Sequence, residues 1–453
     1  MSIILKFGGT SVANTTAINQ VVGIIRRTLP KNPVVITSAL AHVTNLLLSI
    51  AEFRQKVAVE KILRDLKKRH WEVLRSFKPH IQAKIEPLLT EEFLELERLA
   101  ARLLQKSNVT KKDLDLLASF GERFSSWLLT GALLSQKIPA QRVDSRELVV
   151  TDSNFGAAEV DFEKTRRNFA RKISPLLRRK IIPVITGFIG RNHKGNTTTL
   201  GRGGSDYSAA ITAVCLHAKE IQIWKDIPGF MTADPRVVKT ARIIPQLSFQ
   251  EAAELSYFGA KLLHPKTIHP AVAQNIPVRI LNTFAPDNPG TIIYGKSSLR
   301  QAQADKSLPV MAIAYKKGIT IMNISSLRML GPYGFLEELF RIFAAHRVPI
   351  DVVATSEVSV SMTIEDKTYN AGLIGALQKI GMVEVRHGHV ILSLVGTGLK
   401  NDPRVEAHIF EVFRLAKIPT EMISKGASSI NFTCIIEEKF CEKAVRALHS
   451  KFF

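Results

Sequence analysis

The order of buried strands and amphipathic helices constrains the fold of this chain more than any other feature of its sequence. Residues 1 to about 40 read as strand, helix and strand, and residues 45–134 are almost wholly amphipathic helix. Apolar strands then return, with helical stretches between them, at residues 181–186, 220–224 and 278–282. Strands that alternate with helices usually form a largely parallel sheet. The sequence therefore predicts an α/β domain that extends to about residue 295.

An internal repeat marks the C-terminal part of the chain, after a polar, linker-like stretch at residues 297–307. A Phe-x-x-Phe motif followed by a proline appears at Phe340 and Pro349 and recurs 70 residues later at Phe410 and Pro419. The repeat predicts two copies of a small α+β module, each with the order strand, helix, strand, strand and helix. The aromatic residues at helical intervals in the first copy are predicted to lie in its core: Phe335, Phe340 and Phe343.

Composition narrows the classes of protein to which the chain can belong. Its 62 lysines and arginines outnumber its 40 aspartates and glutamates and give a formal net charge of +22. The basic residues alternate with apolar ones, as on solvated helix faces, without the interleaved aromatic residues of a single-strand binder. We therefore favour a basic surface that attracts small anionic substrates, and expect no nucleic-acid partner. No apolar run reaches the roughly 18 residues of a spanning helix, so we expect no membrane partner.

The cysteines and the N-terminus predict a cytoplasmic protein. Cys215, Cys434 and Cys441 are widely spaced and form no C-x-x-C pair. They read as free thiols in a reducing compartment, with neither a disulfide nor a metal centre. The chain opens as a strand, with no charged segment leading into an apolar stretch, and so predicts no secretion signal.

A possible phosphate-binding corner lies at the start of the chain. Residues 2–7 suit a buried strand, Gly8 and Gly9 permit a sharp turn, and Thr10-Ser11 can cap the helix that follows. Such a corner directs backbone N–H groups and the positive end of a helix dipole at one point, which suits an anion. Lys6 adds a full charge beside it. A Gly-Gly corner can also be purely structural, so this motif alone leaves both readings open.

Three segments in the middle of the chain carry side chains suited to small charged ligands; they are residues 197–207, 224–236 and 258–265. In the first, glycines let the backbone approach a ligand, Arg202 can hold a carboxylate with two hydrogen bonds, and Asp206 suits an ammonium group. The second is a turn-rich loop directly after a strand, and the third places Lys261 shortly after a glycine. Ahead of them, Thr110-Lys-Lys-Asp113 resembles a capping box and predicts the start of a helix.

Together with Lys6-Phe-Gly-Gly-Thr-Ser, these segments in this order resemble aspartate kinase, a family with the amino-acid kinase fold followed by paired ACT regulatory domains. The resemblance covers nearly the whole chain and is greatest to lysine-inhibited, single-function members. It implies a catalytic domain over residues 1–295, largely helical from 45 to 135, and paired ACT domains over residues 308–453. Modules of this type usually associate across subunits, so a homodimer or larger homo-oligomer is expected.

The resemblance implies transfer of the γ-phosphoryl group of ATP, bound with Mg²⁺, to the β-carboxylate of L-aspartate, giving 4-phospho-L-aspartate. This reaction is the entry step toward diaminopimelate and lysine, threonine and methionine, and inhibition by lysine is expected. The acceptor carboxylate is already ionised at neutral pH, so no general base is needed. The difficulty is to bring two anions together, which cationic side chains and N–H donors from Gly8 and Gly9 would make possible.

The matching motifs imply roles for individual residues. Catalysis is expected from Lys6, Gly8, Gly9, Asp206 and Lys261. Aspartate is expected to bind Thr44, Glu122, Arg202 and Ser205, with Glu122 and also Asp206 facing its ammonium group. ATP is expected to bind Lys6, Gly9, Asp226, Met231, Arg236 and Lys261. A lysine effector is expected to bind Met329, Gly334, Phe335, Leu336, Ile350, Asp351, Ser356 and Glu357.

Two positions of the nucleotide segment depart from the family pattern. Lys225 and Met231 stand where close relatives commonly carry a small polar residue and a tyrosine. Contacts to the adenosine end of ATP are therefore expected to differ here from those of close relatives.

Two other readings are weighed against the kinase. The first is a catalytically idle amino-acid sensor that has kept its ACT modules and binds nucleic acid. Such a sensor would need none of the charged residues shared with the family, so their presence favours the kinase. The second is a P-loop, because residues 290–297 satisfy its consensus letter for letter. Strong strand formers fill the loop positions of that match, so we interpret it as a strand and the match as coincidence.

Overall fold

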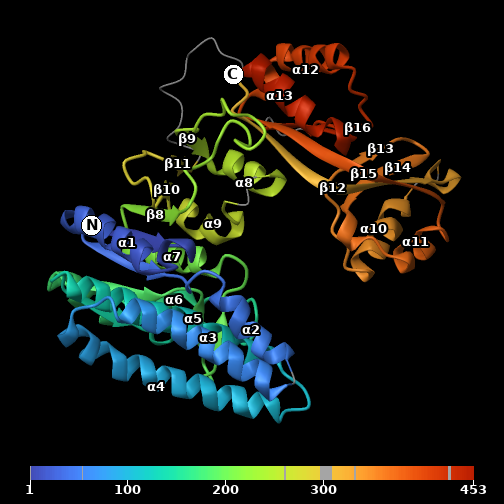
Figure 1. The fold of residues 1–453 in the computed structure, drawn as a ribbon. Coiled ribbons are helices and arrows are strands. Elements are labelled where there is room, and N and C mark those ends of the chain that lie inside the picture. The colour runs from blue at the N-terminus through green and yellow to red at the C-terminus, as the bar shows by residue number, and fades with distance from the viewer. Residues whose placement is uncertain (1, 54, 260–261, 296–308, 331–332, 427–429) are drawn as a thin grey trace. The chain divides into compact units, whose positions relative to one another are not determined.

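The computed structural model describes residues 2–53, 55–259, 262–295, 309–330, 333–426 and 430–453 (Figure 1). The chain divides into two compact units. The first comprises Met1–Phe230, Pro245–Phe249 and Leu262–Leu299, and the second comprises Met231–Ile244, Gln250–Lys261 and Arg300–Phe453. The expected domain boundary between residues 295 and 308 stays a prediction, because residues 296–308 lie outside the described part of the chain.

An eight-stranded sheet forms the centre of the first unit. Its strand order is β3 (Ala140–Val143), β5 (Ile182–Thr186), β2 (Pro33–Thr37), β1 (Ile3–Phe7), β8 (Glu220–Lys225), β10 (Val278–Asn282), β11 (Thr291–Tyr294) and β9 (Gln246–Ser248). Neighbouring strands run parallel except β10 and β11, which are antiparallel. The predicted, mostly parallel α/β sheet is confirmed. Because Thr291–Tyr294 is a strand, the rejection of the P-loop is also confirmed.

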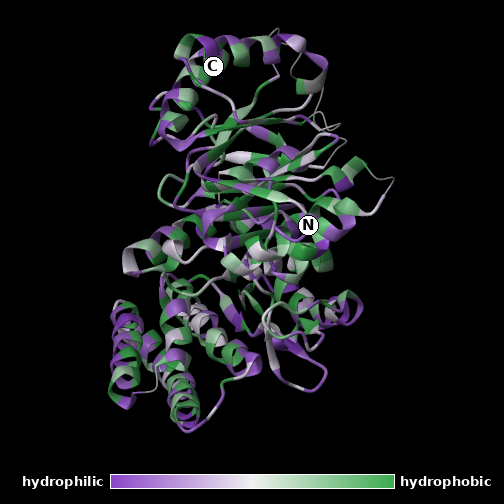
Figure 2. Ribbon diagram, turned by 90° about the vertical axis from the view of Figure 1, so that its right-hand side faces the viewer, coloured by the Kyte–Doolittle hydropathy of each residue, from purple (hydrophilic) through white to green (hydrophobic). Residues whose placement is uncertain are grey.

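Helices cover both faces of this sheet. The first unit contains α1 (Thr15–Thr28), α2 (Val43–Glu52), α3 (Lys56–Leu74), α4 (Pro79–Leu104), α5 (Lys111–Ser135), α6 (Phe162–Arg178), α7 (Gly204–Leu216) and α9 (Pro265–Ala273). A small sheet of β4 (Val150–Thr151), β6 (Ile189–Asn192) and β7 (Thr197–Thr199) lies in the same unit. Hydrophilic and hydrophobic residues alternate along the long helices, in keeping with one buried and one solvated face (Figure 2).

Side chains alternate between the two faces of the sheet along β1, and this alternation decides which way Lys6 points. Ile3, Leu5 and Phe7 belong to an apolar core built with residues of α1 and α5. Because successive strand residues point to opposite faces, Ile4 and Lys6 face the other side of the sheet, where α7 contacts β1. Lys6 therefore points toward the start of α7.

Local signals at helix starts gave one correct and one wrong prediction. The capping box of α5 is confirmed, because Asp113 N donates to Thr110 Oγ1 at 3.3 Å and Thr110 N donates to Asp113 Oδ2 at 2.8 Å. The predicted cap of α1 is wrong. The side chain of Asn14 caps that helix by accepting a hydrogen bond from the amide of Ala17. The Ser11 hydroxyl instead forms a buried hydrogen bond with Thr283 Oγ1 at 2.7 Å.

A six-stranded antiparallel sheet forms the centre of the second unit. Its strand order is β13 (Val353–Thr355), β14 (Ser359–Glu365), β12 (Ala312–Ser325), β15 (Met382–Val395), β17 (Asn431–Glu437) and β16 (Met422–Ser424). The helices are α10 (Phe335–Ala345), α11 (Ala371–Leu377), α12 (Pro403–Ala416) and α13 (Cys441–Phe452). Each copy of the repeat has the predicted order of strand, helix, strand, strand and helix, so the duplication is confirmed.

The two copies bury equivalent side chains. Phe343 and Phe413, the second phenylalanines of the repeated motif, are buried, whereas the first, Phe340 and Phe410, are 40% and 43% exposed. The prediction that Phe340 lies in the core is therefore wrong. Three residues are less than one helical turn, so the two phenylalanines point in directions that differ enough to leave one in solvent.

Helix α8 (Phe249–Phe258) belongs to the second unit from Gln250 onward. Asn431 Nδ2 donates to Glu254 Oε2 at 2.8 Å, and the Tyr257 hydroxyl donates to Asp351 Oδ1 at 2.6 Å. These two bonds attach α8 to both copies of the module. No helix among the described residues combines the length and the apolar character needed to cross a bilayer.

A buried charge network holds α4 against α5 and β3. Glu92 accepts hydrogen bonds from Arg123 Nε at 2.6 Å and from Arg142 Nη2 at 2.9 Å. Arg123 also bonds Glu95, and Arg142 also pairs with Asp144 at 3.4 Å. Removal of a buried ionic partner leaves the remaining charge without compensation, which destabilises the fold.

We expect Glu92→Ala to lower the free energy of unfolding of the first unit by about 2–3 kcal/mol. This is less than the roughly 3–5 kcal/mol lost when a buried charge has no partner left, because Arg123 keeps Glu95 and Arg142 keeps Asp144. Urea unfolding followed by tryptophan fluorescence measures this unit, since all 3 tryptophans lie in it. Glu91→Ala, which removes the exposed neighbour on the same helix, is the matched control, and equal stabilities of the two variants would contradict the prediction.

Candidate active site

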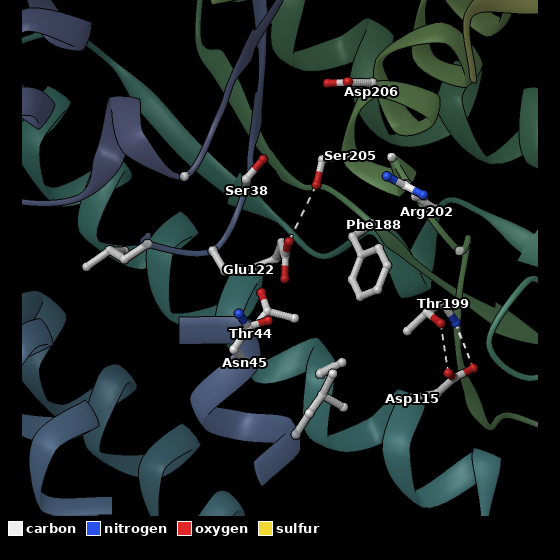
Figure 3. Close-up of a pocket in the computed structure, with 18 of the residues that line it drawn as sticks. Ser38, Thr44, Asn45, Asp115, Glu122, Phe188, Thr199, Arg202, Ser205 and Asp206 are labelled. Atoms are coloured by element: carbon white, nitrogen blue, oxygen red, sulfur yellow. Dashed lines mark hydrogen bonds between the residues drawn. The ribbon is translucent and has the colours of Figure 1, made fainter. Parts of the chain in front are cut away.

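A cavity of about 830 Å³ lies in the first unit, beside the carboxyl ends of β1 and β2 (Figure 3). This is the edge at which open parallel sheets bind their ligands. Residues directly after both strands line the cavity, together with α5 and the start of α7. It brings together the following predicted residues: Lys6, Gly9, Thr44, Glu122, Arg202, Ser205 and Asp206.

Lys6 and Asp206 form a buried ion pair at the wall of this cavity. Lys6 Nζ lies 2.7 Å from Asp206 Oδ1, and each side chain is 7% exposed. Lys225 Nζ lies 3.4 Å from the other carboxylate oxygen. Although burial opposes ionisation, the two lysines hold the pKa of Asp206 below its usual value. Asp206 thus bonds lysines of the protein, which differs from the expected direct contact with a substrate ammonium group.

The glycine corner supplies one amide donor rather than two. Gly8 N donates to the carbonyl of Trp224 at 3.0 Å, so the structure does not support Gly8 as a donor to phosphate. The Gly9 amide donates no hydrogen bond within the described part of the chain. A Cβ on Gly9 would lie 2.9 Å from the carbonyl oxygen of Ala39, so only glycine lets the backbone pass this close.

Glu122 presents an unpartnered carboxylate oxygen inside the cavity. It lies on α5 and is 3% exposed. Its Oε1 accepts a long hydrogen bond from Ser205 Oγ at 3.4 Å, while Oε2 has no hydrogen-bond partner among the described residues. Figure 3 shows this carboxylate between Ser205 and Thr44. Burial raises the pKa of Glu122 to about 8. A cationic ligand group beside this carboxylate would favour its ionised form.

Arg202 supplies positive charge on the opposite part of the cavity wall. It is exposed in the turn before α7 and forms no ion pair with any described residue. Gly201 and Gly203 on either side have φ angles of +75° and +72°, a left-handed conformation that favours glycine and turns the backbone around the arginine. The guanidinium is therefore available to a carboxylate ligand.

Several lining residues are absent from the predicted set: Ser38, Asn45, Asp115, Phe188 and Thr199. Asp115 accepts hydrogen bonds from Thr199 N at 2.9 Å, Thr199 Oγ1 at 2.7 Å and Gly156 N at 3.0 Å, so it fixes β7 and a loop against α5. No local pattern marks a single aspartate within a helix. Ser38 could have been found, because it directly follows the strand at residues 33–37 and parallel strands place ligands at that end.

The residues expected to bind ATP are not gathered in this cavity. Asp226 is exposed just after β8. Met231 and Arg236 belong to the second unit, where Arg236 pairs with Asp234 at 2.7 Å. Lys261 lies outside the described residues. Their roles toward the nucleotide therefore stay predictions.

The residues expected to bind an effector lie in the first copy of the module. Gly334, with a φ angle of +100°, begins α10, where Phe335 is buried and Leu336 is 41% exposed. Met329 and Ile350 pack against the core of this copy. Ser356 and Glu357 are exposed between β13 and β14.

One of these residues already has a cationic partner. Asp351 Oδ2 lies 2.8 Å from Lys316 Nζ, in addition to its bond with Tyr257. Its side chain is 3% exposed. An ammonium group from outside would therefore share this carboxylate with Lys316 or displace it.

Comparisons with known proteins agree with this architecture. The amino acid kinase family model matches residues 1–282, and an ACT domain model matches residues 392–452. The lysine-sensitive aspartokinase 3 of Escherichia coli is 36% identical over 463 residues, which cover 100% of this chain and 99% of that protein. The chloroplastic aspartokinase 1 of Arabidopsis thaliana is 35% identical over 471 residues, covering 100% of this chain and 80% of that protein.

Solved structures agree as well. Crystal structures of E. coli aspartokinase III cover 100% of this chain at 34% identity, with a TM-score of 0.84 for the complex with aspartate and ADP and 0.85 for the complex with lysine and aspartate. The first covers 100% of the matched chain and the second 99%. Full-length similarity at this level, on a matching fold, shows that this chain belongs to the aspartate kinases of the amino acid kinase family.

Proposed function

We propose that the cavity of the first unit binds L-aspartate and that the protein phosphorylates its β-carboxylate with ATP. The observation that carries the proposal is the convergence of Lys6, Arg202 and the unpartnered carboxylate of Glu122 on one cavity. An amino acid with two carboxylates and one ammonium group matches this set of charges. Relatives of the whole chain are aspartokinases, which favours the kinase over the alternative of an idle nucleic-acid-binding sensor.

Each end of aspartate has a complementary group. Arg202 binds the α-carboxylate through its guanidinium, which can donate two parallel hydrogen bonds. Glu122 binds the α-ammonium group; the Ser205 hydroxyl donates to Glu122 Oε1, and Thr44 lies on the other side of the carboxylate. This orientation leaves the β-carboxylate for the end of the cavity where Lys6 lies.

The reaction needs positive charge rather than a proton acceptor. The β-carboxylate attacks as an anion, and the transferred phosphoryl group carries further negative charge. Lys6 offsets that charge, and Asp206 holds its ammonium group in place. The Gly9 amide adds one uncharged donor.

ATP enters as its Mg²⁺ complex. The phosphate oxygens of ATP and water would supply most ligands of the ion, as is usual for Mg²⁺ at nucleotide sites. Asp226, Met231, Arg236 and Lys261 remain the residues that the family resemblance predicts to bind the nucleotide.

Lysine is the proposed effector and binds the first module beside Asp351 and Glu357. The E. coli relative is named for its sensitivity to lysine and was crystallised with it. The protein is further proposed to act in the cytoplasm as a homodimer or larger homo-oligomer, on the path toward lysine, threonine and methionine.

Replacement of Lys6 tests the proposed cation. We expect Lys6→Ala to reduce kcat by about a hundredfold or more, because one fixed donor to the transition state is lost. ADP release coupled to an optical assay measures this, with aspartate compared against glutamate as acceptor. Lys31→Ala removes an exposed lysine and serves as the control. Turnover of the Lys6 variant near that of the control would refute the assignment.

The pH dependence of aspartate use tests Glu122. Only the ionised carboxylate attracts ammonium, and burial places its pKa at about 8. Accordingly, kcat/KM for aspartate, which reports the free enzyme, should rise about tenfold per pH unit below pH 8 and level off above it. Glu122→Gln should raise KM for aspartate about tenfold or more and flatten this profile. A variant that retains the slope would assign it to another group.

Replacement of Glu357 tests the effector site. We expect Glu357→Ala to weaken inhibition by lysine about tenfold while kcat without lysine is unchanged, since the exposed carboxylate acts only on the effector. Inhibition curves at fixed aspartate and ATP measure the effect. Glu442→Ala, an exposed position on α13, is the control. Superimposable curves for the two variants would remove Glu357 from the site.

A further inference from the structure

Lys225, the last residue of β8, adds a second ammonium group to the carboxylate that already holds Lys6. Its Nζ lies 3.4 Å from Asp206 Oδ2, whereas Lys6 Nζ lies 2.7 Å from Asp206 Oδ1. The Lys225 side chain is 19% exposed, against 7% for Lys6. The cluster therefore holds two positive charges and one negative charge in poorly solvated surroundings.

Structural needs do not account for this surplus charge. Lys6 alone neutralises Asp206, and burial of a further ammonium group is unfavourable unless an anion accompanies it. Burial, together with the charge of Lys6, lowers the pKa of Lys225, although the carboxylates of Asp206 and Asp226 oppose the shift. A site with excess positive charge that remains partly open to solvent is suited to an anionic ligand.

Lys225 also lies beside the glycine corner. A Cβ on Gly8 would be 4.0 Å from Lys225 Cγ and 3.9 Å from Lys6 Nζ, so the stem of one lysine and the ammonium group of the other flank the same glycine. Lys6 and Asp206 line the aspartate cavity, whereas Lys225 is not among its lining residues in the described part of the chain. A phosphoryl donor on the Lys225 side would meet aspartate across the pair of Lys6 and Asp206.

The ammonium group of Lys225 also donates to the main-chain carbonyl of Leu262. Leu262 directly follows Lys261, which the family resemblance assigns to ATP, and it precedes α9. A neutral carbonyl is a weaker partner for an ammonium group than an anionic phosphate oxygen. This bond can therefore be exchanged when a phosphate arrives.

We propose that Lys225 binds the triphosphate of ATP and acts with Lys6 as a second cationic group in phosphoryl transfer. The inference rests on the proposed function, in which ATP is the phosphoryl donor. When the nucleotide binds, the ammonium group exchanges the Leu262 carbonyl for a phosphate oxygen and keeps its contact with Asp206. Two fixed positive charges then stabilise the negative charge of the transferred group.

Equilibrium binding of ATP, ADP and adenosine to the full-length protein tests the inference, and Lys225→Gln is the main variant. Glutamine retains a donor for the Leu262 carbonyl but removes the charge. We expect Kd for ATP and ADP with Mg²⁺ to rise about tenfold or more and Kd for adenosine to stay unchanged, because only the phosphates meet the ammonium group. KM for aspartate should be unchanged and kcat should fall. Lys225→Arg should recover part of the ATP affinity, and Lys219→Gln, an exposed lysine before β8, is the control.

Two outcomes would overturn the inference. If Lys225→Gln binds ATP as tightly as the control while its thermal unfolding midpoint falls, Lys225 is only a clamp between β8 and Leu262. If ATP and adenosine lose affinity equally, the residue shapes the nucleotide site without contacting phosphate. Because binding is measured without aspartate, failure of the protein to phosphorylate aspartate would leave this test intact.

Discussion

The buried ion pair between Lys6 and Asp206 is the interaction on which the rest of the site depends. It joins the central strand of the first unit to the first turn of α7, where backbone N–H groups and the helix dipole already favour negative charge. The neighbouring lysines hold the pKa of Asp206 below its usual value, so its carboxylate stays ionised and orients Lys6. Without the pair, a lysine inside a parallel sheet would be an uncompensated charge.

The charges around the cavity are unequal in a way that suits the chemistry. At one end the ammonium group of Lys6 pairs with Asp206, with Lys225 behind them, while Glu122 is a carboxylate with a raised pKa and one oxygen that has no hydrogen-bond partner among the described residues. An acceptor with one ammonium group and two carboxylates can therefore pair each of its charges with a group of opposite sign. Specificity and catalysis then have the same physical origin, which is the cost of unpaired charge in a poorly solvated space.

The second unit connects regulation to the catalytic part of the sequence through one helix. Helix α8 immediately precedes the segment that contains Lys261, yet its side chains bond residues of both modules. Tyr257 of this helix and Lys316 of β12 share Asp351, the carboxylate proposed to receive an effector. Any ligand that competes for Asp351 must change the contacts of α8. Helix α8 thus links the carboxylate proposed for the effector, along the chain, to the segment that contains Lys261.

The sequence by itself determined the alternation of strands and helices, the duplicated module and the capping box of α5, and its motifs named Lys6, Glu122, Arg202 and Asp206 of the charged residues that line the cavity. These features repeat at short periods or occupy contiguous motifs, so local patterns contain them. Only the tertiary structure decided which groups pair: Asp206 bonds Lys6 and Lys225, the Gly8 amide bonds Trp224, and Asp115 bonds β7. It also decided that Phe340 is exposed to solvent. Such pairings join residues that lie far apart in the sequence, as Lys6 and Asp206 do. They follow from strand order and side-chain direction, which no local pattern specifies.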